Sequence, residues 1–179
     1  MKKNILLGVT ASIAAYKACE IIGLLRKKGY GVRCVMSPDA EKFVTELTLE
    51  TLTRQKVVTG LFRGTGGMNP VHISLAEEAD LILIAPATAD IIGKIASGIV
   101  DDALTCTVCA SDGPVLFAPA MNDKMFANPI VQGNIESLRG YGYHFVGPAE
   151  GRLACDKQGK GHLAPLEKVV EKAEQLLSK

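Results

Sequence analysis

The chain carries almost no net charge, and it lacks a membrane-spanning segment and a signal peptide. It has 20 Lys and Arg against 19 Asp and Glu, a formal net charge of +1. This balance favours neither nucleic acid nor an anionic membrane as a partner. No apolar run reaches the roughly 18 residues that a membrane span needs, and the N-terminus lacks the long apolar stretch and cleavage site of a signal peptide. We therefore expect a folded protein of the cytoplasm.

Cysteine is too sparse for a disulfide scaffold, with five in 179 residues. Cys106 and Cys109 form a CxxC pair, which is typical of a redox pair or half a metal site, but no second pair stands at zinc-like spacing. We expect no metal site, and we expect both thiols to pack in the core as small hydrophobes. Cys155 differs because it lies in a Gly- and Lys-rich loop, where nearby Lys157 favours the thiolate. A reactive thiol and an incidental exposed thiol are both consistent with that context.

Short apolar segments alternate with helical patterns along the whole chain. The expected strands are residues 4–9, 32–36, 80–85, 115–118 and 143–146, and the expected helices are 12–28, 39–54, 89–97, 101–110, 130–139 and 165–179. Residues 59–69 and 147–161 are Gly-rich and predict irregular loops. Short, apolar strands between helices predict an α/β fold, a three-layer α/β/α sandwich with a parallel sheet, Rossmann-like or flavodoxin-like. The length suits a single domain over residues 1–179.

Small residues and hydroxyl groups follow three of the predicted strands. The candidate cofactor-binding residues are Gly8, Thr10, Ser12, Ile13, Ser37, Pro86, Ala87, Thr88, Ala89 and Asp90. A small-residue turn that opens a helix suits a phosphate, although N-capping explains Ser12 and Ser37 equally well. The first turn matches neither GxGxxG nor GxxxxGK[ST], so the dinucleotide and triphosphate fingerprints are absent. Because these loops share one edge of the sheet, we expect them to bind one cofactor with a phosphate and a polar chain.

A polar residue also follows the fourth predicted strand, in the segment PAMNDKMF at residues 119–126. Asn122 there lies beside Met121, at the edge where an open α/β sheet binds its ligands. Of the three histidines, His72 begins a helix, where a surface or capping role and a catalytic role both remain open. His144 lies in a strand-like segment and predicts a packed or solvent-facing ring. His162, in the second Gly-rich loop, is ambiguous.

Five segments, in order, resemble the homo-oligomeric flavin-containing cysteine decarboxylases. They are GVTASIAAYK, HISLAEEADLILIAPATAD, GKIASGIVDDALT, APAMNDKMFANP and GPAEGRLACDKQGKGHL. The resemblance implies FMN held by the loops at 8–13, 37 and 86–90, and an active site between subunits of a trimer, often assembled into a dodecamer. His72 matches the family's catalytic histidine, Asn122 its ligand for the substrate carboxylate, with Met121 and Ala120 beside it, and Cys155 its reactive cysteine.

The resemblance also implies a reaction on a small-molecule substrate, the decarboxylation of 4′-phosphopantothenoylcysteine in coenzyme A biosynthesis. Oxidation of the thiol gives a thioaldehyde, loss of CO2 leaves an enethiolate, and reduction completes the reaction, with His72 assisting the oxidative half and Cys155 supplying a proton. The alternatives are a decarboxylase of peptidyl cysteine and a non-catalytic FMN-binding regulatory protein. Ala11, Asp156 and Phe126 depart from the family pattern without removing a named catalytic group.

Overall fold

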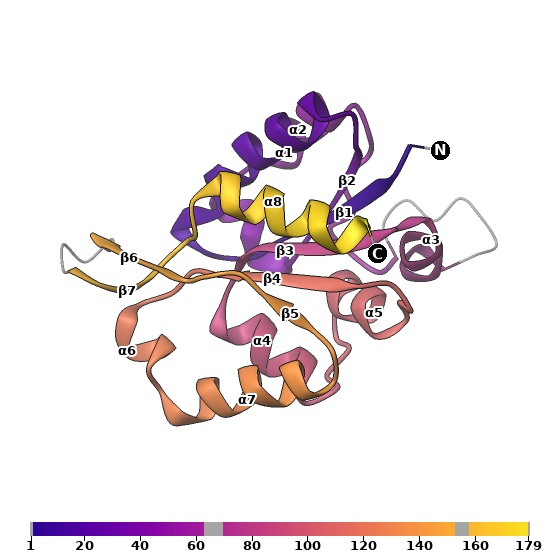
Figure 1. Ribbon diagram of the computed structural model, residues 1–179. Coiled ribbons are helices and arrows are strands. Elements are labelled where there is room, and N and C mark those ends of the chain that lie inside the picture. The colour runs from indigo at the N-terminus through magenta and orange to yellow at the C-terminus, as the bar shows by residue number, and fades with distance from the viewer. Residues whose placement is uncertain (1, 63–69, 153–157, 179) are drawn as a thin grey trace.

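The protein is built around one five-stranded parallel sheet (Figure 1). The structure, a computed structural model, describes residues 2–62, 70–152 and 158–178. The sheet strands are β1 (Asn4–Val9), β2 (Gly31–Met36), β3 (Leu81–Ala87), β4 (Val115–Pro119) and β5 (His144–Phe145). Their order is β2-β1-β3-β4-β5, which is the flavodoxin-like order of a doubly wound sheet. The predicted α/β sandwich is thus confirmed, with its strand order now defined.

Helices cover both faces of the sheet and make the three layers visible in Figure 1. The helical elements are η1 (Ile13–Tyr16), α1 (Lys17–Lys27), η2 (Pro38–Lys42), α2 (Glu46–Thr53), α3 (Val71–Glu78), α4 (Ala89–Ala96), α5 (Ala103–Cys109), α6 (Asp123–Phe126), α7 (Pro129–Gly140) and α8 (Leu166–Leu177). One layer holds α1, α2 and α8, and the opposite layer holds α3, α4, α5 and α7. None of the helices in the described residues is long and apolar enough to cross a membrane.

Alternation along the strands divides the core between these two layers. In β1, Ile5 and Leu7 pack toward α1 and α8, whereas Leu6 packs toward the layer of α3 and α4. All six residues from Ile5 to Thr10 are buried, so both faces of the strand are covered. A strand buried on both faces reads as an unbroken apolar run, which is why its position could be predicted from the sequence.

Several element boundaries differ from the sequence-based expectation, and two of the differences have a clear local cause. The helix expected over 39–54 is two elements, η2 and α2, because Thr45 adopts an extended conformation and caps α2, accepting a hydrogen bond from Thr48 N. The strand expected to stop before Pro86 continues through it to Ala87, with a shift in register to β4 between Ile84 and Ala87. Proline has no N–H to donate, and a bulge is where a sheet accommodates it.

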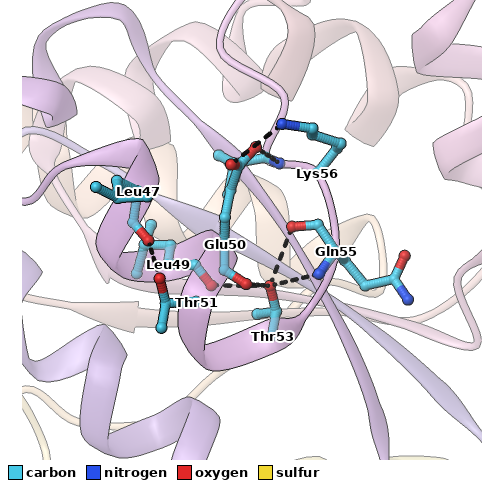
Figure 2. A network of polar contacts seen from close by, with 8 residues as sticks. Leu47, Leu49, Glu50, Thr51, Thr53, Gln55 and Lys56 are labelled. Carbon is cyan, nitrogen blue, oxygen red and sulfur yellow. Dashed lines mark hydrogen bonds and ion pairs between the residues drawn. The ribbon is translucent and has the colours of Figure 1, made fainter.

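Side-chain hydrogen bonds fix the turn that follows α2 (Figure 2). The Thr53 hydroxyl donates to the carbonyl of Leu49 at 2.8 Å and accepts from Gln55 N at 3.3 Å. Glu50 accepts from Val57 N at 3.2 Å and forms an ion pair with Lys56 at 3.3 Å. These contacts return the chain to the sheet, where Val58 makes a parallel bridge to Val35 of β2.

The second Gly-rich stretch contains an antiparallel hairpin, where the sequence predicted an irregular loop. Strands β6 (Ala149–Arg152) and β7 (Gln158–His162) pair with each other and project from the sheet on the left of Figure 1. Glycine is unfavourable in strands, which hid this hairpin from the sequence analysis. The tight approaches that these glycines permit explain their presence, as described for Gly161 below.

The cysteines follow the expectation only in part. Cys34 is fully buried in the core, and burial raises the pKa of its thiol above the ordinary range. Cys109, expected in the core, is exposed, and Cys106 is half-buried. The prediction for that pair is wrong because Cys109 lies at the outer face of α5 at its last residue. In the described part of the chain, no group of three or more His, Cys, Asp or Glu side chains is placed to hold a metal.

Candidate functional site

A cavity of about 850 Å³ opens at the carboxyl edge of the sheet. Its walls are the loops that follow β1, β2, β3 and β4, together with the end of β7. This is the edge at which doubly wound sheets bind ligands, and the volume falls within the range of roughly 300–1,000 Å³ typical of small-molecule sites. The predicted site residues that line it are Ser12, Ile13, Ser37, Thr88, Ala89, Asp90, Ala120, Met121 and Asn122. The structure therefore brings together most of the candidates from four separate loops.

Four of the predicted cofactor residues lie behind this wall and do not line the cavity. They are Gly8, Thr10, Pro86 and Ala87. A Cβ on Gly8 would lie 2.7 Å from Leu104 Cδ1, so this glycine allows close packing between β1 and α5. Pro86 and Ala87 are buried in β3. These residues support the loops above them, and a direct contact with a cofactor stays a prediction.

Thr10 joins two of the loops that form the cavity wall. Its buried hydroxyl donates to the carbonyl of Pro86 at 2.7 Å and accepts from Thr88 N at 3.3 Å. Thr88 in turn caps α4, accepting a hydrogen bond from Ile91 N. The loop after β1 is thus fixed relative to the start of α4.

We expect Thr10→Val to lower the free energy of unfolding by about 1–3 kcal/mol, because a same-shaped apolar group leaves a buried carbonyl and N–H without partners. The measurement is the urea midpoint at an unchanged m-value. Thr51→Val is the matched control, since the Thr51 hydroxyl donates to the Leu47 carbonyl at 2.7 Å on the exposed face of α2 (Figure 2). A loss at Thr10 no larger than the loss at Thr51 would contradict this role.

Three of the charged residues that line the cavity take part in ion pairs. Lys94 on α4 lies 3.1 Å from Asp101 and 3.7 Å from Asp90. Burial alone would lower the pKa of Lys94, but its contacts with these two carboxylates outweigh burial and raise that pKa. Asp39 forms an ion pair with Lys42 at 2.8 Å, and this hydrogen bond lowers the pKa of Asp39.

Asn122 occupies a defined position where β4 ends and α6 begins. It is the N-cap of α6, and its Oδ1 accepts a hydrogen bond from Lys124 N at 2.9 Å. That bond orients the amide, so that Nδ2 is its donor end. The side chain lines the cavity beside Met121 and Ala120. A neutral amide donor at the mouth of such a cavity suits a carboxylate ligand.

The hairpin reaches the same loop from the other side. The Gly161 carbonyl accepts a hydrogen bond from Met121 N at 3.0 Å, and a Cβ on Gly161 would lie only 2.1 Å from the Met121 carbonyl oxygen. Lys160 lies 5.8 Å from the centre of the Phe126 ring. Gly161, His162 and Leu163 consequently line the cavity, although the sequence analysis left His162 ambiguous. The alternation of Gly with other residues in QGKGHL was the available signal.

Sequence analysis also missed lining residues on α1 and its first turn. Tyr16 and Lys17 follow Ile13 along η1 and α1 and contribute to the wall, as does Met125 on α6. A helical spacing from Ile13 would have found Lys17, because residues four apart share a helix face. Lys17 brings a positive charge to the wall that the Ser12 loop forms.

The catalytic candidate His72 does not lie in this cavity. His72 is the second residue of α3 and is absent from the lining. Its Nδ1 is buried and has no hydrogen-bond partner among the described residues. Cys155 lies outside the described residues. The single chain therefore places Asn122, but not His72, at the cavity.

Comparison with known proteins gives this arrangement a family. The Flavoprotein family model matches residues 1–178. The probable phosphopantothenoylcysteine decarboxylase of Streptococcus mutans is 41% identical over 179 residues, covering 99% of this chain and all of that protein. The coenzyme A biosynthesis bifunctional protein CoaBC of Bacillus subtilis is 45% identical over 173 residues, covering 97% of this chain. The chain spans 43% of the length of that bifunctional relative.

Solved structures agree with the sequence comparison. A PPC decarboxylase mutant complexed with pantothenoylaminoethenethiol superimposes with a TM-score of 0.87 at 29% identity, covering 100% of both chains. The FMN-dependent cysteine decarboxylase SpaF gives a TM-score of 0.85 at 31% identity, covering 99% of this chain and 98% of that one. This chain belongs to the flavoprotein family.

Proposed function

We propose that the protein is an FMN-dependent carboxy-lyase that converts 4′-phosphopantothenoylcysteine to 4′-phosphopantetheine in coenzyme A biosynthesis. One observation carries the proposal: the loop at Ser12 and Ile13, which suits a phosphate, and the Asn122 amide line the same cavity. The similarity to one relative named as a probable phosphopantothenoylcysteine decarboxylase, and to another named for coenzyme A biosynthesis, supports the same substrate. We further propose that the enzyme acts in the cytoplasm.

The residues that line the cavity fit a flavin mononucleotide. The turn at Ser12 and Ile13, with Ser37 across from it and Lys17 on the wall, offers hydroxyl groups and positive charge for a phosphate and a ribityl chain. Thr88 and Ala89 begin α4 and would border the ring, with Asp90 beside them. SpaF, which shares the fold, is named as FMN-dependent. When bound, FMN supplies the reversible oxidation that the substrate thiol needs.

The protein's own groups position the substrate and move protons. The Asn122 amide would hold the substrate carboxylate, and as a neutral donor it orients this group without the ion pairing that would oppose its loss. Met121 and Ala120 would form the adjacent wall of the substrate pocket. His72 would assist proton movement in the oxidative half, and Cys155 would return a proton in the reductive half.

His72 does not line the cavity of its own chain, and a second subunit would bring it to the site. We propose a homo-oligomer, a trimer or a dodecamer assembled from trimers, with the active site between subunits. The position of His72 outside the cavity, with Nδ1 buried and unpaired among the described residues, supports this arrangement.

Subunit mixing tests this arrangement. His72→Asn and Asn122→Asp subunits are each expected to retain little activity alone, and co-refolded mixtures should regain part of the turnover because some sites receive both intact residues. Mixtures of two His72→Asn preparations are the control. Hetero-oligomers, verified by differential tags, that stay inactive would contradict the shared site.

The competing function is a decarboxylase of peptidyl cysteine, and a third reading is a regulatory FMN-binding protein without catalysis. A substrate panel separates them: phosphopantothenoylcysteine, a peptide with C-terminal cysteine, and no substrate. We expect a yellow protein whose kcat/KM for the first substrate exceeds that for the peptide. Preference for the peptide would favour the second function, whereas FMN binding without turnover of either substrate would favour the third. A colourless protein that does not bind added FMN would contradict the whole proposal.

A further inference from the structure

We propose that His162 is a substrate-contacting residue, whose Nε2 accepts a hydrogen bond from the amide N–H of the acylated cysteine. The inference rests on the proposed function and assigns a specificity-determining role at the same site. It is carried by three features of the described residues: the fixed position of His162, the tautomer of its ring, and the shortage of other suitable acceptors in the cavity.

His162 is held in place by its neighbours on both sides. Gly161 before it is hydrogen-bonded to Met121 N at 3.0 Å, and a Cβ on Gly161 would lie 3.3 Å from the carbonyl carbon of Asn122. Leu163 after it is 2% exposed. The ring packs on the paired strand β6, since a Cβ on Gly151 would lie 3.4 Å from His162 Cγ. The side chain therefore has a defined place at the cavity, directly beside the Met121–Asn122 loop.

A hydrogen bond to the backbone defines which ring nitrogen carries the proton. His162 Nδ1 lies 2.9 Å from the Leu163 carbonyl oxygen, which can only accept, so Nδ1 is the donor. In the neutral ring, Nε2 is then a lone-pair acceptor. His162 lines the cavity, so its remaining hydrogen-bonding capacity there is that of an acceptor.

Besides His162, the described side chains that line the cavity and can accept a hydrogen bond are two carboxylates, the Asn122 amide and the hydroxyls of Ser12, Tyr16, Ser37 and Thr88. The side-chain oxygens of Ser12, Thr88 and Asn122 already accept backbone N–H groups. Tyr16 and Ser37 lie in the part of the wall proposed for the FMN phosphate and ribityl chain. The carboxylates of Asp39 and Asp90 both line the cavity, but each forms an ion pair with a lysine. A carboxylate would also repel the substrate carboxylate, whereas a neutral imidazole does not. The carboxylate and the amide nitrogen of an acylated cysteine are attached to the same carbon atom. A group that contacts the N–H must therefore lie close to the group that holds the carboxylate, as His162 lies close to Asn122.

A cycle of two changes, one in the protein and one in the substrate, tests this contact in the FMN-loaded enzyme. The variant is His162→Leu, and the substrate analogue carries an ester oxygen in place of the amide N–H. We expect each change alone to raise KM about 5- to 10-fold with kcat within about twofold, as for the loss of one hydrogen bond. The two changes together should raise KM no further, because they remove the same interaction. His162→Gln, which returns an acceptor near the position of Nε2, should restore part of the affinity.

The controls distinguish this inference from the proposed function. Gln158→Ala, an exposed position on the same strand outside the cavity, should leave both kinetic constants unchanged. Normal turnover by the wild type with additive effects in the cycle, or with no effect of the ester substrate on its KM, would overturn the role of His162 alone. If His162→Leu fails to fold, the ester substrate can still overturn the contact with the wild type alone, and His162→Gln takes the place of His162→Leu in the cycle. A wild type that turns over no acylated cysteine would overturn the proposed function and this inference with it.

Discussion

Asn122→Asp is expected to lower kcat/KM for phosphopantothenoylcysteine by about 100-fold or more while leaving stability nearly unchanged. The two side chains have the same shape, and Asp is as good an N-cap as Asn, so the bond to Lys124 N can persist. What changes is the charge, because a carboxylate replaces a donor amide where the substrate carboxylate is proposed to bind. Like charges in such a contact cost several kcal/mol, and about 2.7 kcal/mol corresponds to 100-fold.

Asn128→Asp is the matched control for this substitution. Asn128 is the N-cap of α7, and its Oδ1 accepts from Ile130 N at 2.9 Å, the same distance as at Asn122. It does not line the cavity. Steady-state kinetics and urea unfolding of both variants separate the effect of charge at the site from the effect of charge at a helix start. Wild-type kcat/KM in Asn122→Asp would remove Asn122 from the carboxylate contact.

Gly161→Ala is expected to reduce activity by about 100-fold and to destabilise the fold by about 1–3 kcal/mol. The new Cβ would lie 2.1 Å from the Met121 carbonyl oxygen and 3.2 Å from its carbonyl carbon. These are backbone atoms, so the clash can be relieved only by moving β7 away from the loop that carries Asn122. A displacement of about 1 Å at a positioning group is enough for a loss of this size.

The control for Gly161 is Gly133→Ala in the middle of α7, where an added Cβ meets nothing within 4 Å. For this variant we expect unchanged kinetics and a free energy of unfolding about 0.5–1 kcal/mol higher, because alanine stabilises a helix more than glycine does. Thermal unfolding and kcat/KM of the two variants make the comparison. If Gly161→Ala retained full activity and stability, β7 would not be packed against the Met121 loop as described.

The sequence was sufficient to predict the central strands β1, β3 and β4 because both of their faces are buried. The strand expected at residues 4–9, which is apolar from Ile5 onward, has the same bounds as β1. The loops at the ends of the strands could also be predicted, since parallel strands end at a common edge, and Ser12, Thr88 and Asn122 do line one cavity. That part of the site follows from the fold class and the order of the residues alone.

The missed features depend on contacts between segments distant in sequence. The alternating glycines of QGKGHL are only a weak local sign of β7, because their cause lies elsewhere: Gly161 is required by the backbone of Met121 forty residues earlier. His162 enters the site through that contact, so its place could not be predicted from its own surroundings. The boundary between η2 and α2 was missed for a local reason. Helix-forming residues on both sides of Thr45 concealed its role as the N-cap of α2. His72 and Asn122 remain apart in one chain, a separation that sequence order does not indicate.

The proposed decarboxylation is tested most directly by a single-turnover experiment on the FMN-loaded protein, with phosphopantothenoylcysteine labelled at the carboxyl carbon. We expect one labelled CO2 and one phosphopantetheine for each substrate molecule consumed, with no net oxidation of the thiol. Consumption of the substrate without release of labelled CO2, or no reaction by protein that has bound FMN, would contradict this proposal.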